Sequence, residues 1–114
     1  MTSMIESYRF GSITIDGKKY TKDLIVFPDR IQPDWWRKTG HLLTLEDIQE
    51  ILDYRPRVLV IGTGVSGLMK VDDAVLEKLE SMDIEYVIER SSKAVKEYNK
   101  VCDKRAVLAL HLTC

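Results

Sequence analysis

The sequence predicts one α/β domain: a three-layer fold with a central mixed, mainly parallel sheet flanked by helices, plus an N-terminal antiparallel β-hairpin subdomain. Three observations predict this fold. A turn signal between short alternating segments near the N-terminus indicates hairpins. A continuous apolar run in the middle of the chain indicates a strand covered on both faces. From there on helical and strand patterns alternate, which is typical of right-handed crossovers in a parallel sheet.

Length and composition restrict the class of protein. The chain has 114 residues, 45% of them hydrophobic, and no internal repeat, so we expect a single domain over residues 1–114. Its 17 Lys and Arg residues nearly balance its 18 Asp and Glu residues, which argues against nucleic acid as a partner. We find neither a secretory signal nor an apolar segment of the ~18 residues that span a bilayer, so we expect no membrane partner and a cytoplasmic location.

The first forty residues are expected to form antiparallel hairpins. Asp16-Gly17 is a two-residue turn signal that calls for positive φ. The β-rich segment 24–27 stops at Pro28, which cannot donate a ladder hydrogen bond. Residues 35–37 are predicted to return as a short strand.

The rest of the chain is expected to alternate between helices and strands. Thr44, with Asp47 three residues later, predicts a helix start, and Asp72 predicts a second. Ser91 or Ser92 is expected to cap a third helix. The strands are predicted at residues 58–61, 84–88 and 106–112.

A glycine-rich motif follows the apolar strand directly. Residues 62–67 match G-x-G-x-x-G, in which glycines let the backbone approach a pyrophosphate at a helix N-terminus. The match is incomplete, because four residues separate the third glycine from the helix cap at Asp72. Three interpretations remain open: dinucleotide binding, a smaller anion held by loop N–H groups, and a structural connection that needs positive φ.

Basic residues before the first helix supply a second candidate site. Arg37 and Lys38 lie close in sequence to His41, a pattern that holds a phosphate or carboxylate or simply forms a solvated turn. If this segment and the glycine motif share one end of the sheet, Lys70 adds a third cation to a common pocket. The candidate ligand-binding residues are therefore Gly62, Thr63, Gly64, Ser66, Gly67, Lys70, Lys38 and His41.

Two adjacent tryptophans suggest a partner surface. Trp35 and Trp36 in an extended segment point to opposite sides, so one enters the core and the other is available to a partner unless another element covers it. Together with Arg37 they are the candidate partner-binding residues.

No catalytic set is recognisable. His111 and Cys114 form a Cys–His pair, which suggests a redox thiol as one alternative, but a thiol at the last position has little to preorganise it. The other cysteine, Cys102, is expected to act as a small apolar residue, and no CxxC pair is present for zinc. We therefore expect no catalytic residue, no metal and no other cofactor.

The order of several motifs resembles a known family. The segments are Arg9-Phe10-Gly11, Pro28-Asp29-Arg30, Trp35-Trp36-Arg37, His41, Ile61-Gly62-Thr63-Gly64, Ser66-Gly67-Leu68-Met69 and Leu110-His111-Leu112-Thr113-Cys114. Together they resemble the small Mth-type domain of unknown function, whose members include a mitochondrial assembly factor for respiratory complex I and an adipogenesis-associated protein of animals. The resemblance implies a three-layer fold with a hairpin subdomain, no assigned catalytic residue, and action through protein partners.

These observations lead to a functional expectation. We expect a non-catalytic protein-interaction or assembly-type module with an unidentified protein partner and with self-association through an exposed hairpin edge. The alternative is a binder of a small anionic ligand or nucleotide, or an enzyme that uses one, at the Gly62–Gly67 loop.

Overall fold

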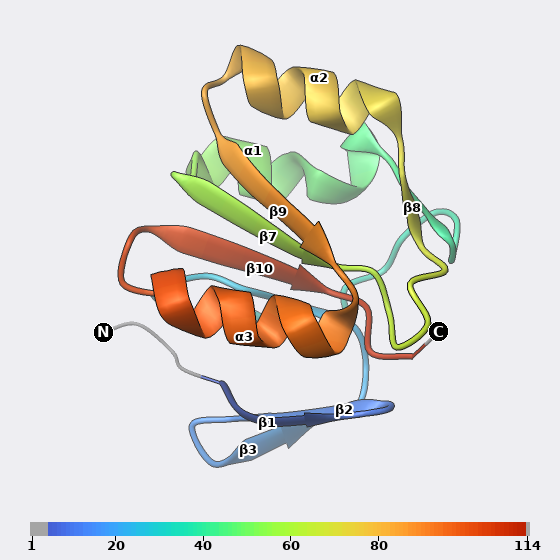
Figure 1. The fold of residues 1–114 in the computed structure, drawn as a ribbon, viewed down its shortest axis with the longest axis vertical. Helices are drawn as coiled ribbons and strands as arrows, with labels where there is room; N and C mark the ends of the chain where they lie inside the picture. The colour runs from blue at the N-terminus through green and yellow to red at the C-terminus, as the bar shows by residue number, and fades with distance from the viewer. Residues whose placement is uncertain (1–4, 114) are drawn as a thin grey trace.

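The computed structural model describes residues 5–113, which form three layers (Figure 1). The elements in chain order are β1 (Ile5–Arg9), β2 (Ser12–Ile15), β3 (Lys18–Tyr20), β4 (Leu24–Val26), β5 (Ile31–Gln32), β6 (Leu42–Leu43), a 3₁₀ helix η1 (Leu45–Ile48), α1 (Gln49–Tyr54), β7 (Val58–Gly62), β8 (Lys70–Val71), α2 (Asp73–Ser81), β9 (Glu85–Glu89), α3 (Ser91–Val101) and β10 (Ala106–Leu110). The mixed α/β fold with a separate N-terminal antiparallel sheet, predicted from the sequence, is confirmed.

The central sheet has five strands in the order β5-β4-β10-β7-β9. The pairs β10–β7 and β7–β9 are parallel, whereas β4 pairs antiparallel with both β10 and β5. The sheet is therefore mixed, with as many antiparallel as parallel pairs, because the β4–β5 hairpin extends one edge. β7 and β10 are buried along their whole length, as the continuous apolar runs predict.

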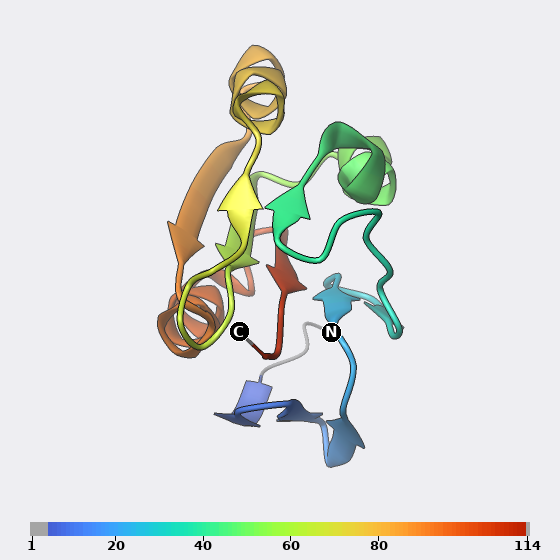
Figure 2. The same cartoon turned by 90° about the vertical axis from the view of Figure 1, so that its right-hand side faces the viewer.

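Two hydrophobic cores lie on opposite faces of this sheet. One core joins the sheet to α3 and to the N-terminal strands, with Tyr98 as its largest fully buried side chain. The other joins the sheet to α1 and α2 through side chains such as Phe27 and Leu59. Figure 2, turned by 90°, shows the helices on either side of the sheet.

The N-terminal strands form a separate antiparallel sheet in the order β1-β2-β3. Asp16 and Gly17 connect β2 to β3 with φ of 50° and 80°, so the predicted positive-φ turn is confirmed. Ile5, Ile13 and Ile15 from this sheet pack into the core against α3. The hairpin subdomain is thus held to the main domain by apolar burial.

Two of the three predicted helix starts are confirmed. Asp47 accepts hydrogen bonds from Thr44 N at 2.9 Å and from Thr44 Oγ1 at 3.0 Å, and Asp72 accepts one from Ala74 N at 3.3 Å. The third prediction is wrong by one or two residues, because Arg90 is the N-cap of α3 and Ser91 is its first helical residue. The hydroxyl of Ser91 is bound to other segments instead of capping the helix.

The predicted strand at residues 35–37 is wrong. Asp34 adopts φ of 55°, which turns the chain out of the extended conformation, and residues 35–37 join no sheet. Individual hydrogen bonds hold the segment, beginning with Trp35 N donating to Asp23 O at 2.7 Å. The strands β9 and β10 match their predictions apart from shifts of one or two residues at their ends.

Candidate functional site

The loop that follows β7, residues 63–69, is called the glycine loop here. Five of its seven backbone N–H groups donate within the protein: Thr63 N to Glu89 O (2.9 Å), Gly64 N to Ser91 Oγ (2.8 Å), Val65 N to Thr113 O (2.6 Å), Gly67 N to Gly64 O (3.3 Å) and Met69 N to Thr63 O (3.2 Å). These five amides are therefore bonded to the protein itself. The side chains of Val65, Ser66 and Leu68 on this loop are exposed.

Ser91 fastens the glycine loop to the end of β10. Its buried hydroxyl accepts from Gly64 N and donates to His111 O at 2.5 Å, so one side chain joins two chain segments. Gly62 makes this approach possible, because a Cβ atom there would lie 2.4 Å from Leu110 Cδ1 and 2.9 Å from Ser91 Oγ. The first glycine of the motif thus serves close packing between β7, β10 and α3.

The loop continues into β8 rather than into a helix. β8 pairs in parallel with β6, and Lys70 N donates to His41 O at 2.7 Å. The third glycine, Gly67, has φ of 71° and lies well before α2 begins. A helix N-terminus directly after the glycines, as a pyrophosphate site requires, is therefore not present at this loop.

A buried polar cluster lies beside the end of β10. Asp23 Oδ2 accepts from Arg37 Nη1 at 2.7 Å and from His111 Nδ1 at 2.8 Å, and Asp23 Oδ1 accepts from Leu112 N at 2.8 Å. Arg37 Nη2 also donates to Gly40 O at 3.1 Å. The Asp23 cluster therefore joins the segment before β4, the segment after β5 and the end of the chain described.

The charges of this cluster stabilise the ionised carboxylate. Burial raises the pKa of Asp23, but hydrogen bonds from His111, Leu112 N–H and Arg37 outweigh it and bring the pKa below the ordinary value. Because the carboxylate oxygen only accepts, we assign a proton to His111 Nδ1, so Arg37 Nη2, which lies 3.1 Å from this nitrogen, has its acceptor in Gly40 O instead. Nε2 of His111 is buried and has no protein partner. The nearest aromatic ring is that of His41, with 6.3 Å between ring centroids.

This arrangement resembles an Asp–His pair that could act as a base, but the free nitrogen is enclosed by protein. Asp23 was not predicted as a site residue, and its only signal in the sequence was an acidic residue directly before a fully apolar strand. His111 was noted only for its closeness to Cys114, which lies outside the described residues. Cys102 is buried, in agreement with its expected apolar role.

The two tryptophans separate as the alternation predicted, although they are not in a strand. Trp35 is buried and its Nε1 donates to Asp47 O at 3.0 Å, while the Trp36 side chain is 77% exposed. Arg37 is also buried, so Trp36 alone of the three candidate partner residues faces solvent. Around it is a hollow of about 590 Å³, lined by Ile25, Gln32, Asp34, Trp35, Trp36, Lys38, Glu46, Asp47, Gln49 and Glu50.

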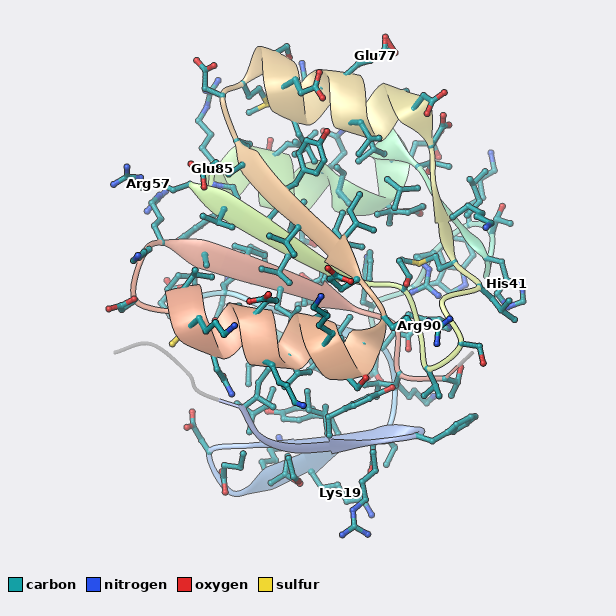
Figure 3. The ribbon with its side chains drawn as sticks, viewed as in Figure 1. Lys19, His41, Arg57, Glu77, Glu85 and Arg90 are labelled. Atoms are coloured by element: carbon teal, nitrogen blue, oxygen red, sulfur yellow. The ribbon has the colours of Figure 1, made fainter. Side chains whose placement is uncertain are left out.

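The remaining candidate ligand residues are divided between the interior and the surface. Thr63 is buried and its hydroxyl donates to Glu89 O at 3.1 Å, whereas Lys38, His41 and Lys70 are exposed. Arg90 was not predicted, and its side chain packs on Gly67 with Cγ 3.3 Å from the point where a Cβ atom would lie. Figure 3 shows His41 and Arg90 at the same end of the molecule, beside the glycine loop.

Within residues 5–113, no group of three or more His, Cys, Asp or Glu side chains is placed to hold a metal ion. None of the helices in this part of the chain combines the length and the apolar character that a membrane crossing requires.

Several solved structures are similar to this fold. A conserved hypothetical protein, PH1505 from Pyrococcus horikoshii, matches with a TM-score of 0.82 and 28% identity, over 96% of this chain and 98% of its own. The protein MT938 matches with a TM-score of 0.79 and 26% identity, over 99% and 100% of the two chains. A Mth938-like domain protein from Bordetella pertussis shares the fold at 16% identity and a TM-score of 0.70, over 96% and 85%.

A family model matches nearly the whole domain, from residue 5 to residue 112. The match spans the hairpin sheet, the glycine loop and the Asp23 cluster together. The resemblance inferred from the order of motifs is thereby confirmed. The chain belongs to the family described as protein of unknown function DUF498/DUF598, the Mth938-like domains.

Proposed function

We propose that this protein is a non-catalytic interaction module that holds a partner protein on the surface around Trp36. The observation that carries the proposal is a large aromatic side chain that is 77% exposed between two buried neighbours. Tryptophan is enriched among the residues that dominate binding energy at protein interfaces.

The segment that carries Trp36 is held firmly before any partner arrives. Trp35 is bound through its backbone N–H and through its indole N–H, and Arg37 is bound to Asp23 and to Gly40 O. A side chain presented by a fixed backbone loses less conformational entropy on binding than one on a mobile loop. This preorganisation favours a recognition role over a merely solvated turn.

The charge around Trp36 indicates the chemistry of the partner. The hollow contains Asp34, Glu46, Asp47 and Glu50 against a single cation, Lys38. Asp47 is already occupied by capping and Glu50 lies 3.8 Å from Arg30, but Asp34 and Glu46 are exposed. An indole face beside carboxylates suits a lysine or arginine side chain, so we expect the contacting segment to be basic.

Affinity capture with three matched variants tests this function. Wild-type protein and Trp36→Phe, which keeps a flat aromatic ring, are expected to retain a stoichiometric partner from a lysate of the source cells. Trp36→Ser is expected to lose that partner, while the control Lys96→Ser, on the exposed side of α3, is expected to keep it. Equal recovery with Trp36→Ser and wild type, or recovery of no stoichiometric protein, contradicts the proposal.

A second candidate function is the binding of a small anion by basic side chains beside the glycine loop. The observation in its favour is that His41, Lys70 and Arg90 all lie beside the glycine loop. Titration with phosphate, ADP and NAD, followed by amide chemical shifts, tests it. Shifts confined to residues 62–70, to His41 and to Arg90 are expected, and the absence of any shift there removes this candidate.

A further inference from the structure

Three exposed apolar side chains come from two loops that lie at one end of the molecule, and none of them is near Trp36 in the sequence. In residues 5–113, four large hydrophobic side chains are strongly exposed: Trp36, Phe10 (62%), Val65 (40%) and Leu68 (48%). The last three are called the carboxyl-end patch, because the two loops that carry them flank the segment that follows the carboxyl end of β10.

Backbone hydrogen bonds attach the two loops that carry this patch to two consecutive residues, Leu112 and Thr113. Gly11 N, next to Phe10, donates to Leu112 O at 2.9 Å. Val65 N donates to the following carbonyl, Thr113 O, at 2.6 Å. The β1–β2 turn and the glycine loop therefore flank one short stretch of chain, and Figures 1 and 2 show both at the same end of the molecule.

The fixed backbone of the glycine loop explains why these side chains stay exposed. Five of its amides donate within the protein, so the loop is anchored and its apolar side chains remain outside. Gly67, with φ of 71°, directs the chain so that Leu68 is exposed while Met69 is buried. Contiguous exposed apolar surface marks places that a partner covers, and the loop holds Val65 and Leu68 in position to contribute to such a surface.

Cations border this patch. Arg90 packs on Gly67, immediately before Leu68, and Lys70 is exposed two residues after Leu68. Arg9 precedes Phe10 and is also exposed. The neighbouring carboxylate of Glu89 is already paired with Lys93 at 3.3 Å. The border is therefore positive, opposite in sign to the hollow around Trp36.

We propose that the carboxyl-end patch binds an acidic segment of a protein, with apolar side chains against Phe10, Val65 and Leu68 and carboxylates against Arg90 and Lys70. The proposal is independent of the Trp36 surface, which calls for a basic segment. Charge complementarity sets the orientation and the choice of partner, while the apolar contacts supply most of the affinity.

The charge and size of the patch favour a protein segment over a lipid surface. Recognition of anionic lipid by charge typically uses clusters of about four to eight Lys or Arg side chains, whereas three border this patch. Stable attachment to a membrane also needs two anchoring signals, and three side chains bury little apolar area.

Site-specific photo-crosslinking tests the chemistry of the occupant. A photoreactive phenylalanine analogue replaces Leu68 in one variant, Phe10 in a second and Lys96 in a control. In lysate of the source cells, positions 68 and 10 are expected to crosslink the same protein segment, and position 96 is not. Sequencing of that segment is expected to find alternating or clustered Asp and Glu among apolar residues. A basic or neutral segment, or equal yield at position 96, overturns the proposal.

A charge-reversal experiment then separates electrostatic recognition from nonspecific apolar contact. A synthetic peptide of the crosslinked segment is expected to bind wild-type protein at least tenfold more tightly than a version with Lys at every acidic position. The double variant Arg90→Glu, Lys70→Glu is expected to reverse that preference. Equal binding of the two peptides to both proteins overturns the proposal, as does binding to phosphatidylserine vesicles with no binding of the peptide.

The two surfaces can fail separately in these experiments. Loss of crosslinking at positions 68 and 10 leaves the capture result with Trp36→Ser unchanged. Conversely, capture that is insensitive to Trp36 leaves the peptide preference at Arg90 and Lys70 intact.

Discussion

The carboxylate of Asp23 connects three distant parts of the chain. It accepts hydrogen bonds from Arg37, from His111 and from the Leu112 N–H, and its side chain is mostly buried. Removing one member of a buried charge pair is costly because the partner charge is left uncompensated. The segment of Trp36 and the segment beside the carboxyl-end patch therefore both depend on this residue.

Asp23→Asn is expected to lower the free energy of unfolding by about 3 kcal/mol at neutral pH, because Arg37 loses its counter-charge. Urea unfolding measures this, with the exposed Asp29→Asn as a control expected to change stability by less than about 0.5 kcal/mol. A loss as small as that of the control would contradict the role given to Asp23.

The loss of stability caused by Asp23→Asn is expected to depend on pH. Because the pKa of Asp23 is below its ordinary 3.8 in the folded state, the ionised carboxylate stabilises the fold above that value and this stabilisation is lost as pH falls through the folded pKa. The difference between wild type and Asp23→Asn is therefore expected to narrow below about pH 4, where a protonated carboxyl resembles an amide. If the difference in the free energy of unfolding between the two proteins stays constant down to pH 2, ionisation of Asp23 is not the source of the stabilisation.

At the scale of elements, the close contact of β7, β10 and α3 depends on the first glycine of the motif. Ser91 Oγ and Leu110 Cδ1 occupy the space that any side chain at residue 62 would need. The glycine is required by packing inside the protein.

Gly62→Ala is expected to destabilise the protein by about 1–3 kcal/mol, because the methyl group forces Leu110 or the start of α3 to move. Gly40→Ala is the matched control, since no atom lies within 4 Å of the corresponding Cβ position. Thermal unfolding of the two variants measures the difference. If both alanines have the same effect, the close approach of Ser91 is not what requires glycine.

At the scale of the whole molecule, one domain carries two surfaces whose neighbouring charges are opposite in sign. The hollow around Trp36 is acidic, and the carboxyl-end patch is apolar with a basic border. A module that carries two such surfaces can hold two partners in a fixed relation, which suits assembly. Self-association, expected from the exposed hairpin edge, stays a prediction that the hydrodynamic mass at micromolar concentration tests.

If the two surfaces are separate, a substitution in one is expected to weaken binding there and to leave binding at the other unchanged. Trp36→Ser is expected to abolish binding at the acidic hollow and to leave the carboxyl-end peptide bound with unchanged affinity. Leu68→Ser is expected to do the reverse, because each side chain is exposed and contributes little to the fold. Isothermal titration with each partner measures both affinities. If either variant weakens both interactions equally, one shared surface replaces the two separate ones.

Local patterns of the chain predicted much of the architecture. The turn at Asp16-Gly17, the capping residues Thr44 and Asp72, and the buried strands β7 and β10 all follow from neighbouring residues. Such features depend on interactions over a few residues or on the period of apolar residues, both of which can be read from the sequence. The exposure of one tryptophan beside a buried one was predicted from strand alternation, but individual hydrogen bonds to Trp35 and Arg37 hold this segment outside any strand.

The sequence by itself determined the family, the alternation of helices and central strands after the hairpins, and the location of a glycine-containing turn after β7. Only the tertiary structure decided how that turn is used, because its amide partners come from Glu89, Ser91 and Thr113, far along the chain. The pairing of Asp23 with His111 and the gathering of Phe10, Val65 and Leu68 were likewise decided by contacts between distant segments. Hydrogen-bond partners and exposed patches depend on which distant segments come together in the fold, and local sequence patterns do not predict those contacts.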